Sequence, residues 1–195
     1  MKRFMVSLAA LAAPAMLSSP SFAQQSVNTG QLVQELQAVS AKTAVVNVDE
    51  LRKEVTIDIS TQNSEDVVGR DKYRDYFTSL PNFDVEIDFD FDSDRIKPAS
   101  FQALGAMADA LHHPVLLDDK FLIVGHTDAK GTRQYNLDLS QRRADAIRNT
   151  LITVFRVPPQ RLAAFGLGEE QLRDPAHPDA AVNRRVQLLN LGPMN

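Results

Sequence analysis

The sequence contains no cysteine among its 195 residues. This absence excludes disulfide bonds and thiolate zinc sites, and we also expect no lipid-modified N-terminal cysteine. Three further signatures are missing: a glycine-rich phosphate loop, a G-x-S-x-G nucleophile elbow and a helical H-x-x-x-H metal pair. We therefore expect no enzymatic activity, no bound metal and no cofactor.

The first 23 residues differ in character from the rest of the chain. Lys2 and Arg3 precede an apolar stretch that is too short for a membrane span, and small residues lie near Ala23. This pattern is typical of a secretory signal peptide that is cleaved near Ala23. Removal of residues 1–23 makes the net charge more negative than the −4 of the full sequence. The acidic balance argues against nucleic-acid binding, and we expect a soluble mature chain without a transmembrane span.

Residues 24–82 carry no recognisable motif. The spacing of apolar residues predicts short helices over 31–40 and 71–80, whereas strict alternation predicts a half-exposed strand over 54–60. Such amphipathic elements need partners. We therefore expect this segment either to pack against the rest of the molecule or to dock a separate envelope protein.

From residue 83 onwards, apolar and acidic residues alternate in the run DVEIDFDFDSD. This pattern predicts a strand with one buried face and one face in water. The acidic row is either a solvated sheet face or a calcium site, and a straight row of carboxylates does not surround an ion as a loop would. We favour the solvated face. A helix is expected after Pro98 and should end before Pro114.

The most informative stretch runs from Phe121 to Leu151. The apolar run 121–124 predicts a buried strand, and Gly131 permits a tight turn before a long helix. Arg143 falls on the apolar face of that helix, together with Leu139, Ile147, Leu151 and Val154. An unpaired buried charge is very costly, so the Arg143 guanidinium must either reach water or meet an anion.

Asp128, which follows the predicted strand, is the candidate partner for Arg143. One interpretation is that the two side chains simply pair with each other. The other is that they bracket a small zwitterion, with Asp128 binding an ammonium group and Arg143 holding a carboxylate in a bidentate fork. Thr127 and Asn136 flank Asp128, and they are expected to bond to the local backbone, to complete the ligand's hydrogen bonds, or both.

The end of the chain contains two predicted strands, over 161–166 and 181–191, which are separated by a polar surface loop over 167–178. In the last strand, Arg184 shares a face with Val186 and Leu188, whereas Arg185 points the other way. We therefore expect Arg185 to be a charge on the sheet surface.

Several motifs occur together in a fixed order: GHTD at 125–128, Gly131, N-x-x-L-S-x-x-R-A at 136–144 and NRRV at 183–186. In this order they resemble the OmpA-like peptidoglycan-binding domain, the family of the OmpA C-terminal domain, Pal lipoproteins and MotB-type stator proteins. The resemblance covers residues 83–191. It implies an α/β sandwich with helices on one face of a small mixed sheet, and we place this domain at 83–193.

The resemblance also implies a ligand. In this family, the residues matching Asp128 and Arg143 hold the free end of the diaminopimelate side chain in the peptidoglycan stem peptide. Thr127, Asn136 and Arg184 are then expected to assist, with Arg184 as a second carboxylate contact. The zwitterion interpretation of the residues and the family resemblance therefore agree.

Asp94 stands where relatives often carry Asn and where the chain approaches the ligand. An aspartate there either adds a second contact to the ammonium group or repels the carboxylate. We predict a non-catalytic protein of the periplasm, associated with the outer membrane or the cell wall, that binds peptidoglycan and anchors the envelope. The alternative is an interaction protein that docks a partner through residues 24–82 and binds the wall only secondarily.

Overall fold

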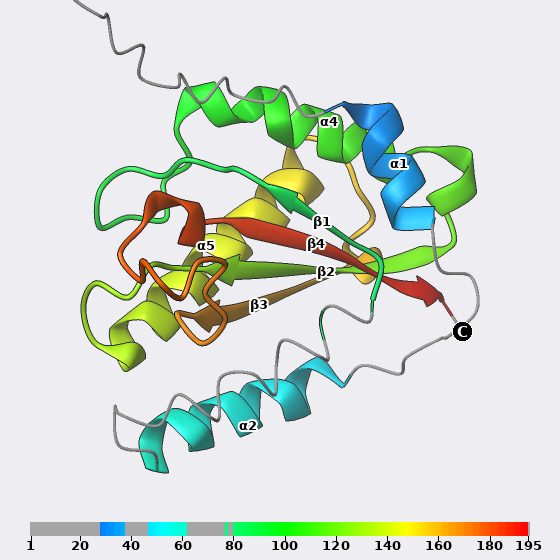
Figure 1. The fold of residues 1–195 in the computed structure, drawn as a ribbon. Coiled ribbons are helices and arrows are strands. Elements are labelled where there is room, and N and C mark those ends of the chain that lie inside the picture. Colours follow the sequence, from blue (N-terminus) through cyan, green and yellow to red (C-terminus); the bar gives the residue numbers. More distant parts are fainter. Residues whose placement is uncertain (1–27, 38–46, 62–76, 78–79, 195) are drawn as a thin grey trace, which may run out of the picture.

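The computed structural model describes residues 28–37, 47–61, 77 and 80–194 (Figure 1). Four strands form one open sheet in the order β1-β4-β2-β3. β4 runs antiparallel to both neighbours, whereas β2 and β3 are parallel. The strands are β1 (Asn82–Val85), β2 (Asp119–His126), β3 (Leu162–Gly168) and β4 (Val186–Pro193). Against them lie helices α1 (Thr29–Gln37), α2 (Val48–Thr61), α4 (Phe101–Leu111) and α5 (Arg133–Thr153).

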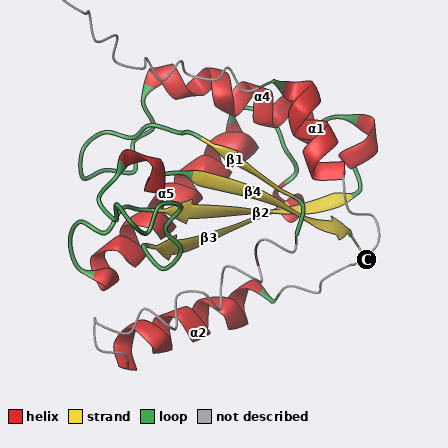
Figure 2. Cartoon of the chain, in the orientation of Figure 1, coloured by secondary structure: helices red, strands yellow, loops and turns green. Residues whose placement is uncertain are grey.

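Helices cover both faces of the sheet, because successive side chains of a strand point to opposite sides. On one face, Phe121 and Ile123 of β2 pack with the apolar residues of α1, α4 and α5. On the other face, Leu122 and Val124 pack in a second cluster that includes Val55 of α2. Figure 2 shows the strands between α2 on one side and α1 and α4 on the other. The predicted α/β sandwich is confirmed, and α2 adds cover on the second face.

Two glycines allow α5 to lie close to the parallel strands. A Cβ atom added to Gly125 would lie 2.5 Å from the carbonyl oxygen of Ser140, and one added to Gly166 would lie 2.3 Å from the backbone nitrogen of Gln141. No side chain fits in these positions without a backbone shift. The close contact fixes α5, which carries Arg143, against the end of β2.

The strand predicted over 54–60 is wrong, because these residues belong to α2. Val55 and Ile59 are four residues apart, so an alternating pattern also places them on one face of a helix. Both pack in the second core, whereas Ile57 is 57% exposed. The side chain of Asn47 accepts a hydrogen bond from the backbone nitrogen of Glu50 at 3.2 Å, which stabilises the start of the helix.

The other elements of the N-terminal segment are only partly described. The helix predicted over 31–40 corresponds to α1, which ends at Gln37, and residues 38–40 lie outside the described residues. The helix predicted over 71–80 also lies outside them except for Phe77 and Leu80, which are buried in the second core.

The strand predicted from residue 83 is shorter than its alternating sequence suggests. Val85 and Ile87 are buried, and Glu86 and Asp88 are exposed, as expected, but Asp84 and Asp90 are half-buried and β1 ends at Val85. Beyond it, Phe89 forms only an isolated bridge with Ile96, and Phe91 is 99% exposed. The chain reverses at Asp92, whose φ of 50° belongs to a turn, and so Phe91 points into solvent.

Two predictions at the C-terminal end are also corrected. The loop over 167–178 is not wholly a surface loop, because 167–172 is buried and Glu170 pairs with Arg133 at 2.5 Å. Arg185 is buried instead of lying on the sheet surface, and its Nη1 donates to the carbonyl oxygen of Gln171 at 3.3 Å. The loop therefore covers this end of the sheet.

The remaining elements follow their predictions with small shifts. β2, α4, α5 and β3 are confirmed, although Val154, assigned to the apolar face of α5, is 58% exposed just beyond the helix. The last strand begins at Val186, so Arg184 lies in the turn before it. None of the described helices combines the length and the apolar composition needed to cross a membrane.

Candidate functional site

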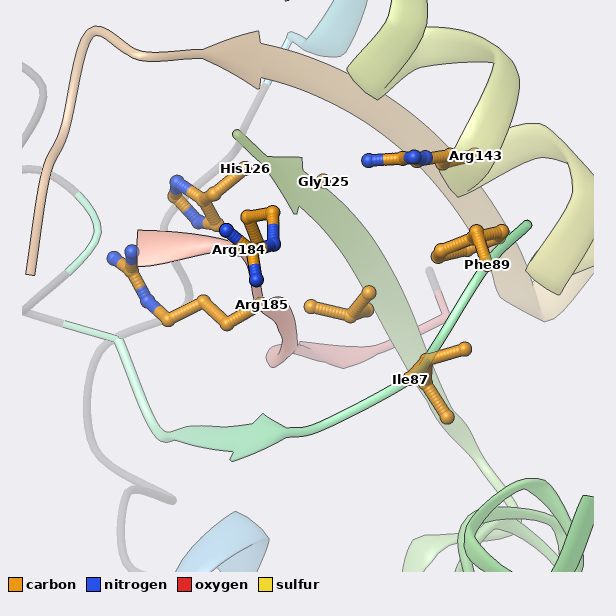
Figure 3. Close-up of a pocket in the computed structure, with 8 residues that line it drawn as sticks. Ile87, Phe89, Gly125, His126, Arg143, Arg184 and Arg185 are labelled. Atoms are coloured by element: carbon orange, nitrogen blue, oxygen red, sulfur yellow. The ribbon is translucent and has the colours of Figure 1, made fainter. Parts of the chain in front are cut away.

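A shallow recess, much of it open to solvent, lies at the end of β2 (Figure 3). It is built from four distant parts of the chain: the segment after β1, the end of β2, the middle of α5, and the turn that leads into β4. The residues that line it are Ile87, Phe89, Gly125, His126, Arg143, Arg184, Arg185 and Val186. Apolar side chains and several cationic ones therefore share one concave surface.

Arg143 projects from α5 into the recess (Figure 3). Its Nε donates to the carbonyl oxygen of Ser93 at 3.0 Å, and its guanidinium lies over the Phe89 ring, 4.8 Å from the centroid. Burial lowers the pKa of Arg143 from its usual value, and the nearby Asp128 acts in the opposite direction. Its two Nη atoms donate no hydrogen bond to any of the described residues. A fixed cation with free donors is a suitable site for a carboxylate.

Asp128 pairs with Arg184 and not with Arg143. Its Oδ2 lies 2.6 Å from Nη1 of Arg184, and its Oδ1 accepts a hydrogen bond from the backbone nitrogen of Lys130 at 3.3 Å. Both interpretations offered for this pair are thus modified. Asp128 and Arg143 are not paired with each other, and the Asp128 carboxylate is paired with Arg184 instead of being free.

Two polar side chains beside Asp128 are buried without a partner. Neither ring nitrogen of His126 makes a hydrogen bond, and the Thr127 hydroxyl makes none, although both side chains are inaccessible. The pKa of His126 lies well below its usual value, chiefly because of burial and also because of the Arg185 charge. The backbone of Thr127 is held by a 2.9 Å hydrogen bond from its nitrogen to the carbonyl oxygen of Gly168.

Asn136 and Asp94 do not line the recess. The Asn136 amide nitrogen donates to Oε2 of the buried Glu169 at 2.5 Å. Asn136 also lies next to Gly131, so it supports the turn at that glycine. Asp94 is exposed, next to Ser93, whose carbonyl holds Arg143. Of the predicted residues, Arg143 and Arg184 line the recess. Asp128 and Thr127 adjoin it, and Asn136 and Asp94 lie farther out.

Some features of the site were not anticipated. The carbonyl of Ser93 carries no side-chain signature, so no sequence pattern could have assigned it to Arg143. Phe89 was placed on the buried face of a strand by alternation, but its position under Arg143 follows only from the fold. In the described part of the chain, no group of three or more His, Cys, Asp or Glu residues is arranged to hold a metal ion.

Comparison with known proteins yields one family and several relatives. The model of the OmpA family matches residues 88–185. The chain is 36% identical over 106 residues to outer membrane porin F of Pseudomonas aeruginosa, a match that covers 53% of this chain and 29% of the porin. It is 35% identical over 102 residues to the peptidoglycan-associated lipoprotein of the same organism, covering 51% of this chain and 58% of the lipoprotein.

Among solved structures, the peptidoglycan-associated lipoprotein of Burkholderia pseudomallei matches with 34% identity and a TM-score of 0.45, covering 53% of this chain and 87% of that one. The chain spans less than two thirds of the length of the curated relatives described above.

Proposed function

Because this chain belongs to the OmpA family, we propose that it binds peptidoglycan without a chemical step, through the free end of diaminopimelate in the stem peptide. The observation that carries the proposal is the state of Arg143. It is a half-buried cation that lines the recess, and the Ser93 carbonyl holds it through Nε. The names of relatives such as the peptidoglycan-associated lipoproteins support the same ligand.

The free end of diaminopimelate carries one ammonium and one carboxylate group. Arg143 binds the carboxylate with its two Nη donors, and little side-chain entropy is lost because Ser93 and Phe89 already fix the guanidinium. Asp128 accepts the ammonium group. The unpaired hydroxyl of Thr127 offers a further hydrogen bond next to Asp128, because a buried polar group without a partner gains by acquiring one.

Three further residues are proposed to assist. Arg184 lines the same recess and contributes to carboxylate binding. Asn136, whose amide nitrogen donates to Glu169, assists from behind the recess by supporting the turn at Gly131. Asp94, exposed beside Ser93, lies where a carboxylate either approaches the ammonium group or weakens the attraction for the carboxylate.

The proposal also assigns a location. The signal-peptide pattern of residues 1–23 leads to cleavage near Ala23 and export to the periplasm. There the domain anchors or stabilises the envelope by holding the wall, in association with the outer membrane or with the wall itself. The relatives named above include an outer membrane porin, which supports this placement.

Calorimetry with a diaminopimelate-containing stem tripeptide tests the proposal. We expect Arg143→Ala and Asp128→Ala each to weaken binding at least about tenfold, since a hydrogen bond to a charged group contributes about 1.5–3 kcal/mol. Arg142→Ala is the matched control: it removes an exposed cation from the neighbouring position of the same helix and should leave the affinity nearly unchanged. Unchanged affinity in either site variant, with the fold intact by circular dichroism, would overturn the proposal.

A further inference from the structure

We propose that Arg184 is an internal counter-ion of Asp128 that the ligand's ammonium group displaces, and that this exchange makes the site select zwitterions. The inference rests on the proposed function and deepens it, because it names what distinguishes the ligand from close analogues. It concerns a feature that an open bracket of two free charges does not explain, namely that Asp128 is already paired.

The ion pair is asymmetric. Oδ2 of Asp128 lies 2.6 Å from Nη1 of Arg184, but the Asp128 side chain is only 10% exposed whereas that of Arg184 is 47% exposed. Asp128 is also held by the Lys130 backbone nitrogen at 3.3 Å, and its neighbour Ala129 donates from its backbone to the carbonyl of Pro178 at 3.1 Å. Asp128 is therefore the fixed partner, and Arg184 is the partner that can leave.

A displaced Arg184 has a destination close by. Arg184 and Arg143 line the same recess but come from different elements, Arg143 from α5 and Arg184 from the turn before β4 (Figure 3). Arg143 already holds its place through Ser93, so a carboxylate bound there lies within the space that Arg184 also borders. When the ammonium group takes over Asp128, Arg184 turns to the carboxylate, and no charge is left unpaired.

This exchange gives the two ligand groups a coupled effect. An amine without a carboxylate must break the Asp128–Arg184 pair and leaves Arg184 with no new anion. A carboxylate without an amine reaches Arg143 but leaves Arg184 on Asp128. Only a zwitterion compensates both side chains, so removal of either ligand group should cost more than one contact.

The test uses three stem tripeptides that differ in one side chain. The first carries diaminopimelate, the second carries lysine, which lacks the side-chain carboxylate, and the third carries 2-aminopimelate, which lacks the side-chain amine. Their affinities are measured by calorimetry for the wild-type chain, for Arg184→Gln and for the charge-matched control Arg142→Gln, with thermal melting as a check on folding.

For Arg184→Gln we expect changes of opposite sign. Binding of the diaminopimelate peptide should weaken about tenfold, because one charged contact is lost. Binding of the lysine peptide should strengthen, or rise from undetectable to measurable, because its amine no longer competes with an internal cation. Binding of the 2-aminopimelate peptide should change little, since Arg184 stays on Asp128 when no amine is present. Arg142→Gln should shift none of the three affinities appreciably.

The results separate the two levels of the argument. If the wild-type chain binds the diaminopimelate peptide but Arg184→Gln leaves lysine-peptide binding unchanged, weaker or undetectable, Arg184 is a simple contact or a structural residue and the exchange is overturned. If the wild-type chain fails to bind the diaminopimelate peptide at all, the proposed function is overturned and this inference with it.

Discussion

At the scale of single residues, the site contains polar groups that the fold leaves unpaired. Among the buried side-chain atoms without a hydrogen-bond partner in the described part of the chain are both ring nitrogens of His126 and the hydroxyl of Thr127. Such groups cost free energy when buried. They lie at the end of β2, next to Asp128 in the sequence.

His126 should make the stability of the protein depend on pH. Its folded-state pKa lies below the ordinary 6.5 because burial and Arg185 disfavour the imidazolium. In the unfolded chain the histidine takes up a proton as the pH falls through 6.5, whereas the folded chain does not, so protons favour unfolding. The free energy of unfolding should therefore fall below pH 6.5, by up to about 1.4 kcal/mol per pH unit from this group.

Urea unfolding of the wild-type chain and of His126→Gln at pH 7.5 and 5.0 measures this contribution. The variant should lose less stability between the two pH values than the wild-type chain. His112→Gln, which replaces an exposed histidine at the end of α4, should retain the wild-type difference. The same loss in His126→Gln as in the wild-type chain would contradict the assignment.

At the scale of elements, the site depends on how closely α5 lies on β2 and β3. Side chains of α5 and α2 also form hydrogen bonds with the backbone at the free edge of β3. These bonds protect the edge from pairing with another strand. Nε of Arg148 donates to the carbonyl of Leu162 at 2.8 Å, Nη2 of Arg52 donates to that of Ala164 at 3.0 Å, and Gln141 accepts from Gly166 at 2.8 Å. Both α5 and α2 thus hold the same edge strand.

Gly166→Ala should displace α5 and disturb the site with it. The added Cβ would lie 2.3 Å from the backbone nitrogen of Gln141, which is too close without a helix shift. We expect a loss of about 1–3 kcal/mol in the free energy of unfolding, as for other overpacked positions, together with weaker binding of the stem peptide, since α5 carries Arg143.

Gly105→Ala is the control for that substitution. Gly105 is in α4, where the nearest atom to an added Cβ is a Phe155 ring carbon at 3.8 Å, and alanine is the better helix former. This variant should be as stable as the wild-type chain or more stable by up to about 1 kcal/mol. Equal stability of Gly166→Ala and the wild-type chain would show that the close packing of α5 is not needed.

At the scale of the whole molecule, the N-terminal segment is part of the packed structure. Leu32, Val33 and Leu36 of α1 are buried in the main core, and Val55 of α2 is buried in the second. If residues 24–82 docked a separate protein, these are the apolar residues that would contact it. The described parts of residues 24–82 therefore use their apolar faces internally.

Leu36→Ala tests this arrangement. Removal of a buried leucine should lower the free energy of unfolding by about 2–5 kcal/mol, measured by urea denaturation. Gln34→Ala, which changes an exposed residue of the same helix, should have little effect. If Leu36→Ala unfolds at the same urea concentration as the wild-type chain, α1 does not contribute to the core, and the alternative of a partner-docking segment regains support.

The sequence by itself determined the elements whose pattern is local and the residues that carry the motifs. The apolar run of β2, the long helix after Gly131 and the inward register of Arg143 depend on neighbours a few positions away, and all three are present in the structure. The prediction was wrong where one local pattern fits two kinds of secondary structure. The spacing of Val55 and Ile59 suits both a strand and a helix, and contact with the second core selects the helix.

The partners of the charged residues were decided by the tertiary structure alone. Asp128 meets Arg184 across 56 positions, and Arg143 meets the Ser93 carbonyl across 50. Such pairings arise where the ends of β2, β4 and the loop after β1 converge, and no spacing along the chain encodes them. Sequence motifs could name the charged residues of the site, but only the folded chain, in which burial makes every unpaired charge costly, decides which of them are matched.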